Sequence, residues 1–181
     1  MKKQQSGFTI IELVVVIVLL GIMAATALPR FMDVTTEAHA SVVNGVEGSL
    51  QSGTSLYHAQ WVAEGQPAKD TAITEYGSLR TNASGYPYGT NDNSGGTSNV
   101  TTSADCVAVY SNLLQTGAPS ITAQANAAAV VGNATDFAGV VSGTNCVYYY
   151  TGEKSASGDT IATLTYDSST GGISQSTATL P

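Results

Sequence analysis

The sequence has few charged residues. They make up 10% of its 181 residues, and 6 basic against 13 acidic side chains leave a formal net charge of −7. Apart from Lys2 and Lys3 the basic residues form no cluster, and the negative balance would repel phosphate. We therefore expect no nucleic acid to bind through a basic face. The length suits one domain, or one domain plus a membrane segment, and the many Ser, Thr, Gly and Asn residues suit a protein outside the cell.

Residues that carry chemistry are also few. The two histidines, His39 and His58, have no third His or Cys spaced near them, and we interpret both as solvated helix residues. The sequence contains no glycine-rich nucleotide-binding motif, P-loop or haem-attachment motif, and no serine stands in a nucleophile elbow. We therefore predict no catalytic residue, no metal and no cofactor, and a protein that is not an enzyme.

Two cysteines are present, Cys106 and Cys146. In an exported protein the natural interpretation is one disulfide. It would close a loop of 41 residues, counting both ends, and the chain-entropy model assigns such a loop roughly 4 kcal/mol. The alternative is a pair of buried free thiols.

Residues 8–28 form an apolar run of 21 residues with a single charge, Glu12. As a helix the run is about 31 Å long, enough to cross a membrane. A secretory signal peptide cut after Ala27 is one interpretation, and a plain membrane anchor with its C-terminal side outside is another. Glu12 fits neither, because a charge at that depth costs about 2.5–3.5 kcal/mol, and Leu28-Pro29 is a poor start for a mature chain.

A third interpretation accounts for the whole segment. The residues that carry it are Lys2-Lys3-Gln4-Gln5-Ser6-Gly7-Phe8-Thr9-Ile10-Ile11-Glu12-Leu13, then Val14-Val15-Val16-Ile17, Gly21, Pro29 and Arg30. This stretch resembles the type IV pilin signature: a short basic leader, Gly, Phe, and Glu as the fifth residue after the Gly. The resemblance implies that residues 1–7 are a leader, that prepilin peptidase cuts between Gly7 and Phe8, and that the new amino terminus of Phe8 is N-methylated.

Glu12 then acquires a role in assembly. The resemblance implies that Glu12 of one subunit meets the Phe8 amine of a neighbour in the filament core, where a buried pair fixes register. Glu12 lies about one helical turn from Phe8, so pairing with the amine of its own chain is the alternative. Pro29 lacks an N–H and predicts a kink or opening of the helix, Gly21 is a second weak point, and the resemblance implies that residues 21–29 are a stretch that can unwind.

A second helical pattern follows, over residues 30–63. Apolar and small residues recur every three or four positions at Phe31, Val34, Ala38, Val42, Val46, Leu50, Gly53, Tyr57 and Trp61. Gly65 and Pro67 are stop signals. Residues 8–63 are thus predicted to form one spine, in which residues 8–29 span a membrane or pack in a filament core and residues 30–63 are amphipathic and pack on the chain's own head.

The remaining residues, 64–181, are predicted to form a globular head. Residues 65–105 are rich in turn formers and read as loop; residues 106–110 suggest a strand and 111–116 a short helix closed by Gly117. Residues 121–140 are ambiguous. Strands are predicted over 146–151, 160–166 and 173–177, with Tyr149 facing opposite to Tyr148 and Tyr150. Antiparallel strands on a helix make the fold class α+β, and the resemblance implies the type IV pilin fold.

The resemblance implies a structural subunit, most like the major pilins of mannose-sensitive haemagglutinin pili on the run Pro29-Arg30-Phe31 and on the segment starting at Cys106. Its partners would be like subunits in a homopolymer, prepilin peptidase and the inner-membrane assembly machinery. It would cross the inner membrane of a Gram-negative bacterium once, with its C-terminus outside, before entering an extracellular pilus that serves adhesion. The alternatives are a type II secretion pseudopilin and a monomeric secreted binding module.

Sequons at Asn82, Asn99 and Asn133 match the glycosylation pattern, and we interpret them as coincidental.

Overall fold

The computed structural model describes residues 7–77, 79–90, 98–114 and 116–181, except the side chains of residues 32 and 33. Residues 1–6 of the predicted leader, with Lys2 and Lys3, and residues 91–97 of the region predicted as loop therefore lie outside the described residues. The chain divides into two compact units, Met1–Ala40 and Ser41–Pro181. The helix α1, Ile10–Ala63, begins in the first unit and ends in the second.

Helix α1 confirms the predicted spine and ends where the sequence predicted. It includes Pro29, so the helix does not open before this residue in the single chain, although Pro29 cannot donate the usual backbone bond. By length and composition α1 is the one described helix that is able to cross a membrane.

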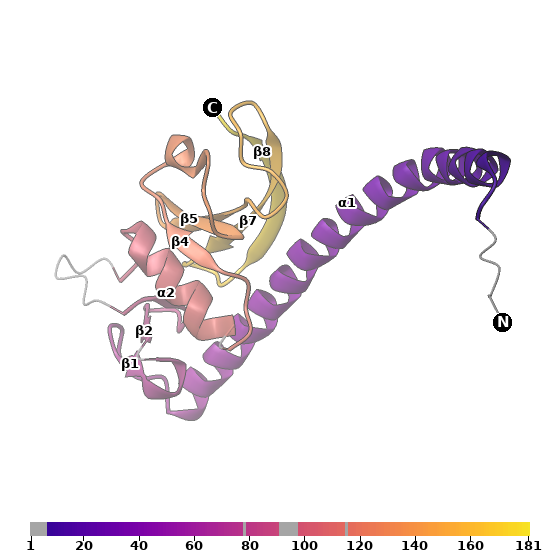
Figure 1. Cartoon of the computed structure of the whole chain (residues 1–181). Coiled ribbons are helices and arrows are strands. Elements are labelled where there is room, and N and C mark those ends of the chain that lie inside the picture. The colour runs from indigo at the N-terminus through magenta and orange to yellow at the C-terminus, as the bar shows by residue number, and fades with distance from the viewer. Residues whose placement is uncertain (1–6, 78, 91–97, 115) are drawn as a thin grey trace. The chain divides into compact units, whose positions relative to one another are not determined.

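The second unit contains two sheets and a second helix (Figure 1). A small antiparallel sheet has the order β1-β2-β3, formed by Ala72–Ile73, Leu79–Thr81 and Pro87–Gly89. A larger sheet has the order β4-β5-β6-β7-β8, formed by Ile121–Ala123, Phe137–Ser142, Asn145–Tyr150, Thr160–Asp167 and Ile173–Thr179. Strand β4 pairs parallel to β5, and every other pair in this sheet is antiparallel. Two 3-10 helices, Thr74–Tyr76 and Ala127–Val130, complete the described elements.

The second helix corrects two predictions. Helix α2, Ser103–Leu114, replaces the strand predicted over 106–110 and begins well before the helix predicted over 111–116. Its first turn is closed by a reciprocal cap: the Asp105 carboxylate accepts from the Thr102 N–H at 2.9 Å, and the Thr102 hydroxyl accepts from the Asp105 N–H at 3.2 Å. Tertiary burial of one face of α2 outweighs the β propensity of its Val and Tyr residues.

The core of the second unit lies between α1, α2 and both sheets. Its buried residues include Val43, Val46, Leu50 and Tyr57 of α1, with Ile73, Leu79, Tyr88, Val109, Tyr110, Phe137, Tyr148, Leu164 and Tyr166 from the other elements. Residues Val43 to Tyr57 therefore pack on the head as predicted. Phe31 and Val34, predicted on the same helix face, are instead 70% and 65% exposed and belong to the first unit. Val43 is 1% exposed whereas the predicted Val42 is 39% exposed, so the buried stripe lies one position later there. On β6 Tyr148 and Tyr150 are buried and Tyr149 is half-buried, in agreement with the predicted alternation.

Candidate assembly site

The first element of the candidate site is the start of α1. Residues Gly7, Phe8 and Thr9 precede the helix. The Glu12 carboxylate accepts two hydrogen bonds through Oε2, from the Thr9 N–H at 2.8 Å and from the Thr9 hydroxyl at 2.6 Å. The Glu12 N–H donates to Thr9 Oγ1 at 3.4 Å. This reciprocal arrangement is a capping box, and it gives Glu12 a local partner that neither predicted pairing with an amine included.

Both bonds to Glu12 end on the same oxygen. Among the residues that the structure describes, none donates to Glu12 Oε1, so this oxygen can accept from a further donor. Phe8 and Glu12 line one shallow hollow together with Leu13, Val16 and Ile17. Glu12 is the one charged residue among those that line the hollow, and the others are apolar. A positively charged group that entered the hollow would therefore lie beside this carboxylate.

The second element is the apolar surface of α1 in the first unit. The large apolar side chains described in this stretch are exposed in the single chain, from Phe8 at 94% to Phe31 at 70%. The set comprises Phe8, Ile10, Ile11, Leu13, Val14, Val15, Val16, Ile17, Val18, Leu19, Leu20, Ile22, Met23, Leu28 and Phe31. A contiguous apolar surface of this length is not stable in water and marks a lipid or protein interface. Gly21 lies within it, with open space where a Cβ would stand.

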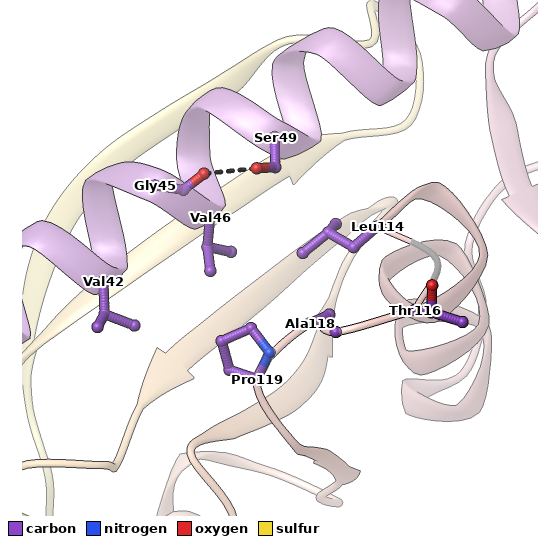
Figure 2. Close-up of a pocket in the computed structure, with 9 residues that line it drawn as sticks. Val42, Gly45, Val46, Ser49, Leu114, Thr116, Ala118 and Pro119 are labelled. Carbon is purple, nitrogen blue, oxygen red and sulfur yellow. Dashed lines mark hydrogen bonds between the residues drawn. The ribbon is translucent and has the colours of Figure 1, made fainter.

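The third element is a groove in the second unit. It lies between α1 and the segment at and after the end of α2, and in Figure 2 Val42 and Val46 point from α1 toward this segment. Its lining residues are Val42, Gly45, Val46, Ser49, Leu114, Thr116, Gly117, Ala118 and Pro119. The Ser49 hydroxyl donates to the Gly45 carbonyl oxygen at 2.7 Å, so this polar group is already satisfied. No lining residue is titratable, and the groove offers packing surface rather than reactive groups.

Comparison with known proteins agrees with this arrangement. Residues 2–28 match the family described as the prokaryotic N-terminal methylation motif. The chain is 38% identical over 90 residues to the type IV narrow pilus major component PilA5 of Thermus thermophilus, a match that covers 49% of this chain and 72% of that protein. This chain belongs to the type IV pilin family.

Other relatives of this pilin match over shorter stretches. A fimbrial protein of Neisseria meningitidis is 37% identical over 78 residues, which is 41% of this chain and 46% of the relative. The type II secretion system core protein G of Pseudomonas aeruginosa is 39% identical over 56 residues, which is 31% of this chain and 39% of the relative. The chain thus spans less than half the length of these two relatives. No solved structure matches the chain.

The head of the pilin is cross-linked by the predicted disulfide. Cys106 of α2 and Cys146 of β6 are bonded, with their Cα atoms 5.3 Å apart. The Tyr148 hydroxyl donates to the Cys106 carbonyl oxygen at 3.0 Å, and complete burial raises the pKa of this phenol far above its usual value. The disulfide and this hydrogen bond both attach α2 to the same strand.

Two titratable groups of the pilin head, Asp136 and His58, contact neighbouring residues. Within the described residues no group of three or more His, Cys, Asp or Glu is placed to hold a metal ion. The Asp136 carboxylate accepts from the Ser120 hydroxyl at 2.6 Å and N–H at 2.9 Å, and these bonds lower its pKa. His58 is not simply solvated as predicted: it is half-buried, and its ring stacks on Tyr86 with centroids 4.7 Å apart.

Two of the three sequons hold asparagines whose amides are already in use. Asn82 is 5% exposed, and its Nδ2 donates to the Ser168 carbonyl oxygen. Nδ2 of the half-buried Asn133 donates to Thr151 Oγ1 at 3.1 Å and to Thr135 Oγ1 at 2.8 Å. Attachment of a sugar at either nitrogen would replace one of its two N–H donors at a site that is already packed, which supports the view that both matches are coincidental.

Proposed function

We propose that this pilin is the structural, and specifically the major, subunit of a pilus. It polymerises through α1 after cleavage between Gly7 and Phe8 and N-methylation of Phe8. The proposed partners are further copies of the chain, prepilin peptidase and the inner-membrane assembly machinery. The subunit waits in the inner membrane of a Gram-negative bacterium with its head outside and then enters an extracellular filament for adhesion.

The observation that carries the proposal is the exposed apolar stretch from Phe8 to Phe31 with a single carboxylate. Its length suits a bilayer, so lipid can hold it before assembly. Transfer from lipid into a bundle of like helices changes its apolar environment little, and packing and polar contacts between helices must therefore favour the filament.

Glu12 supplies the polar contact. In the single chain Thr9 satisfies Glu12 Oε2, and Oε1 is left for a positive group. Cleavage after Gly7 would create such a group, the amine of Phe8. A desolvated amine and carboxylate each need a partner, so pairing between neighbouring subunits would fix the register of assembly without loss of the Thr9 cap.

Small residues allow other helices to approach α1. A Cβ added at Gly21, Gly45 or Gly48 would meet nothing within 4 Å, so these positions present bare backbone to a neighbour. Close approach at small residues is a common way for helices to pack in lipid and in bundles. Opening of residues 21–29 between Gly21 and Pro29 remains a proposal for the assembled state.

A pseudopilin of a type II secretion system is the second candidate, because the P. aeruginosa core protein G shares the N-terminal stretch. The disulfide-bonded head rich in Ser, Gly and Asn favours a filament exposed outside the cell, as does the resemblance to mannose-sensitive haemagglutinin pilins. Electron microscopy of a deletion strain separates the two: loss of long surface filaments supports the pilus, and filaments of normal number and length support the pseudopilin.

Mass spectrometry of the mature amino terminus tests the processing step. We expect a chain that begins at N-methylated Phe8. A chain that begins at Leu28 would instead identify a secreted module released by signal peptidase, and would overturn the proposal.

A further inference from the structure

The outer edge of β8 is an unprotected strand edge. Strand β8, Ile173–Thr179, is the last strand of the larger sheet and pairs with β7 on one side (Figure 1). Across residues 7–77, 79–90, 98–114 and 116–181, no strand pairs with its other side. Natural proteins protect such edges with charges, proline, bulges or very short strands.

None of these protections is present on β8. The sequence Ile-Ser-Gln-Ser-Thr-Ala-Thr contains no charged residue and no proline. Its pairing with β7 is continuous over seven residue pairs, from Thr160 opposite Thr179 to Tyr166 opposite Ile173, and has no bulge. The side chains of residues 174–177 are exposed.

The register shows which backbone groups face outward. The Leu180 N–H donates to the Asp159 carbonyl oxygen, and the Asp167 N–H donates to the Gly172 carbonyl oxygen, each at 2.9 Å. These bonds lie at the two ends of the same antiparallel register, in which hydrogen-bonded and non-hydrogen-bonded pairs alternate. The even-numbered residues of β8 therefore bond to β7. The odd-numbered residues, Ile173, Gln175, Thr177 and Thr179, direct their N–H and C=O groups away from the sheet.

These outward groups are self-complementary. A twofold axis through Ser176 places Gln175 opposite Thr177 of a second copy and Ile173 opposite Thr179. All four outward residues then form hydrogen-bonded pairs, and Ser176 lies opposite its own copy. The chain has a net charge of −7, but none of its charged residues lies in β8. Pairing of two β8 strands therefore brings no like charges directly opposite each other.

The other strand edges do not match β8. The opposite edge of the same sheet, β4, has 3 residues, and the edges of the smaller sheet, β1 and β3, have 2 and 3. Among the described strands, only a second β8 offers a seven-residue edge strand to this edge.

We propose that β8 is a docking edge for β8 of a second copy of this chain, with antiparallel pairing about Ser176. Such a contact is isologous and closes on itself, whereas extension of a filament requires a head-to-tail contact. It therefore joins heads that belong to two different filaments, and it is separate from the assembly through α1.

A single cysteine on the axis tests the register. In the full-length chain, Ser176→Cys would lie opposite its own copy in a non-hydrogen-bonded pair, about 4.5 Å apart between Cα atoms, within the range of a disulfide. Ser174→Cys is the matched control, since it would lie opposite Ala178 and about 14 Å from its own copy. In concentrated protein in detergent and on filaments, mild oxidation should cross-link S176C into dimers and leave S174C monomeric. Equal cross-linking of both variants, or none of S176C, would overturn the proposal.

A substitution on the edge tests the consequence for filaments. Thr177→Pro removes an outward N–H and leaves the bonds to β7, and edge strands tolerate proline at such positions. Thr177→Ala changes the side chain and keeps the backbone edge. By electron microscopy we expect wild-type and T177A filaments to associate side by side and T177P filaments to stay separate at unchanged number. Associated T177P filaments, or separate wild-type filaments at every concentration, would contradict the proposal. Absence of filaments from the wild-type strain would contradict the proposed function. It would not decide the β8 contact, which the S176C test in detergent examines without filaments.

Discussion

Gly53 of α1 lies directly against Leu113 of α2. A Cβ added at Gly53 would stand 3.1 Å from the Leu113 carbonyl oxygen and 3.2 Å from its Cβ, closer than an ordinary contact. Gly48, one and a half turns earlier, has nothing within 4 Å of the same position. The folded chain therefore has no room for a side chain at Gly53, whereas it has room for one at Gly48.

This contrast predicts opposite effects of alanine. Gly48→Ala should raise the free energy of unfolding by up to about 1 kcal/mol, because alanine favours a helix more than glycine does. Gly53→Ala should instead lower the free energy of unfolding, because the added methyl group would force Leu113 of α2 to move away from α1. Urea unfolding of the full chain in detergent measures both variants, and equal stability of G53A and G48A would contradict the close packing of α1 on α2.

Thr54 provides a second stability test. Its side chain is 3% exposed, and its hydroxyl has no hydrogen-bond partner among the described residues. A buried unsatisfied hydroxyl costs about 1–3 kcal/mol. Thr54→Val removes the hydroxyl at similar shape and should raise the unfolding midpoint, whereas Thr54→Ser keeps the hydroxyl, removes a methyl group and should lower it. A lower midpoint for T54V than for the wild type would show that the hydroxyl has a partner in solution.

The disulfide should be a large contributor to the stability of the head. The double variant Cys106→Ala/Cys146→Ala avoids mispaired thiols, and we expect it to lose about 2–5 kcal/mol of unfolding free energy, as is typical for the removal of a native disulfide. The wild type treated with a reducing agent is the matched comparison. A loss well under 1 kcal/mol would mean that packing around Tyr148 holds α2 on β6 even when the disulfide is absent.

Stability should fall at low pH. The pKa of Asp136 is lowered by its bonds from Ser120, and that of Asp167 by its bonds from Ser169 and Thr170. The pKa of aspartate in the unfolded chain is about 3.9. The stability that these groups contribute is therefore present above this pH and is lost as the pH falls through their lower folded pKa values. Thermal unfolding followed from pH 6 to pH 2 should show this loss, and Asp136→Asn should lose less over the same range. Identical pH profiles of the two proteins would contradict the assignment to Asp136.

The long elements of the fold were predictable from the sequence because their patterns repeat many times. The period of α1 and the alternation of β6 and β7 extend over enough residues to be recognised. The turn formers of residues 65–105 predict a loop, whereas this region contains β1, β2 and β3. Strands of 2 or 3 residues are too short to show a period. Strand β4 was ambiguous because its pairing parallel to β5 depends on contacts distant in sequence.

The caps were present in the sequence and were missed. Thr9 and Glu12 stand three residues apart at the start of α1, and Thr102 and Asp105 do so at the start of α2. Both pairs match the pattern of a capping box. The second pair indicates a helix where β propensity favoured a strand, and the first supplies Glu12 with a partner inside its own chain.

The Thr9–Glu12 contact makes the role of Glu12 directly testable. If Glu12 only caps α1, then Glu12→Gln, which keeps an acceptor for Thr9, should assemble as the wild type does. If Glu12 pairs with the Phe8 amine of a neighbour, the loss of charge in E12Q should block assembly as fully as Glu12→Ala does, while both variants remain in the membrane.

The decisive measurement is the amount of sheared surface filaments relative to membrane-bound pilin in strains that express wild-type, E12Q or E12A chains. We expect membrane-bound pilin in all three strains and filaments in the wild type alone. Wild-type filament yield from E12Q would contradict the charge pair, and wild-type yield from E12A would contradict a role of Glu12 in assembly.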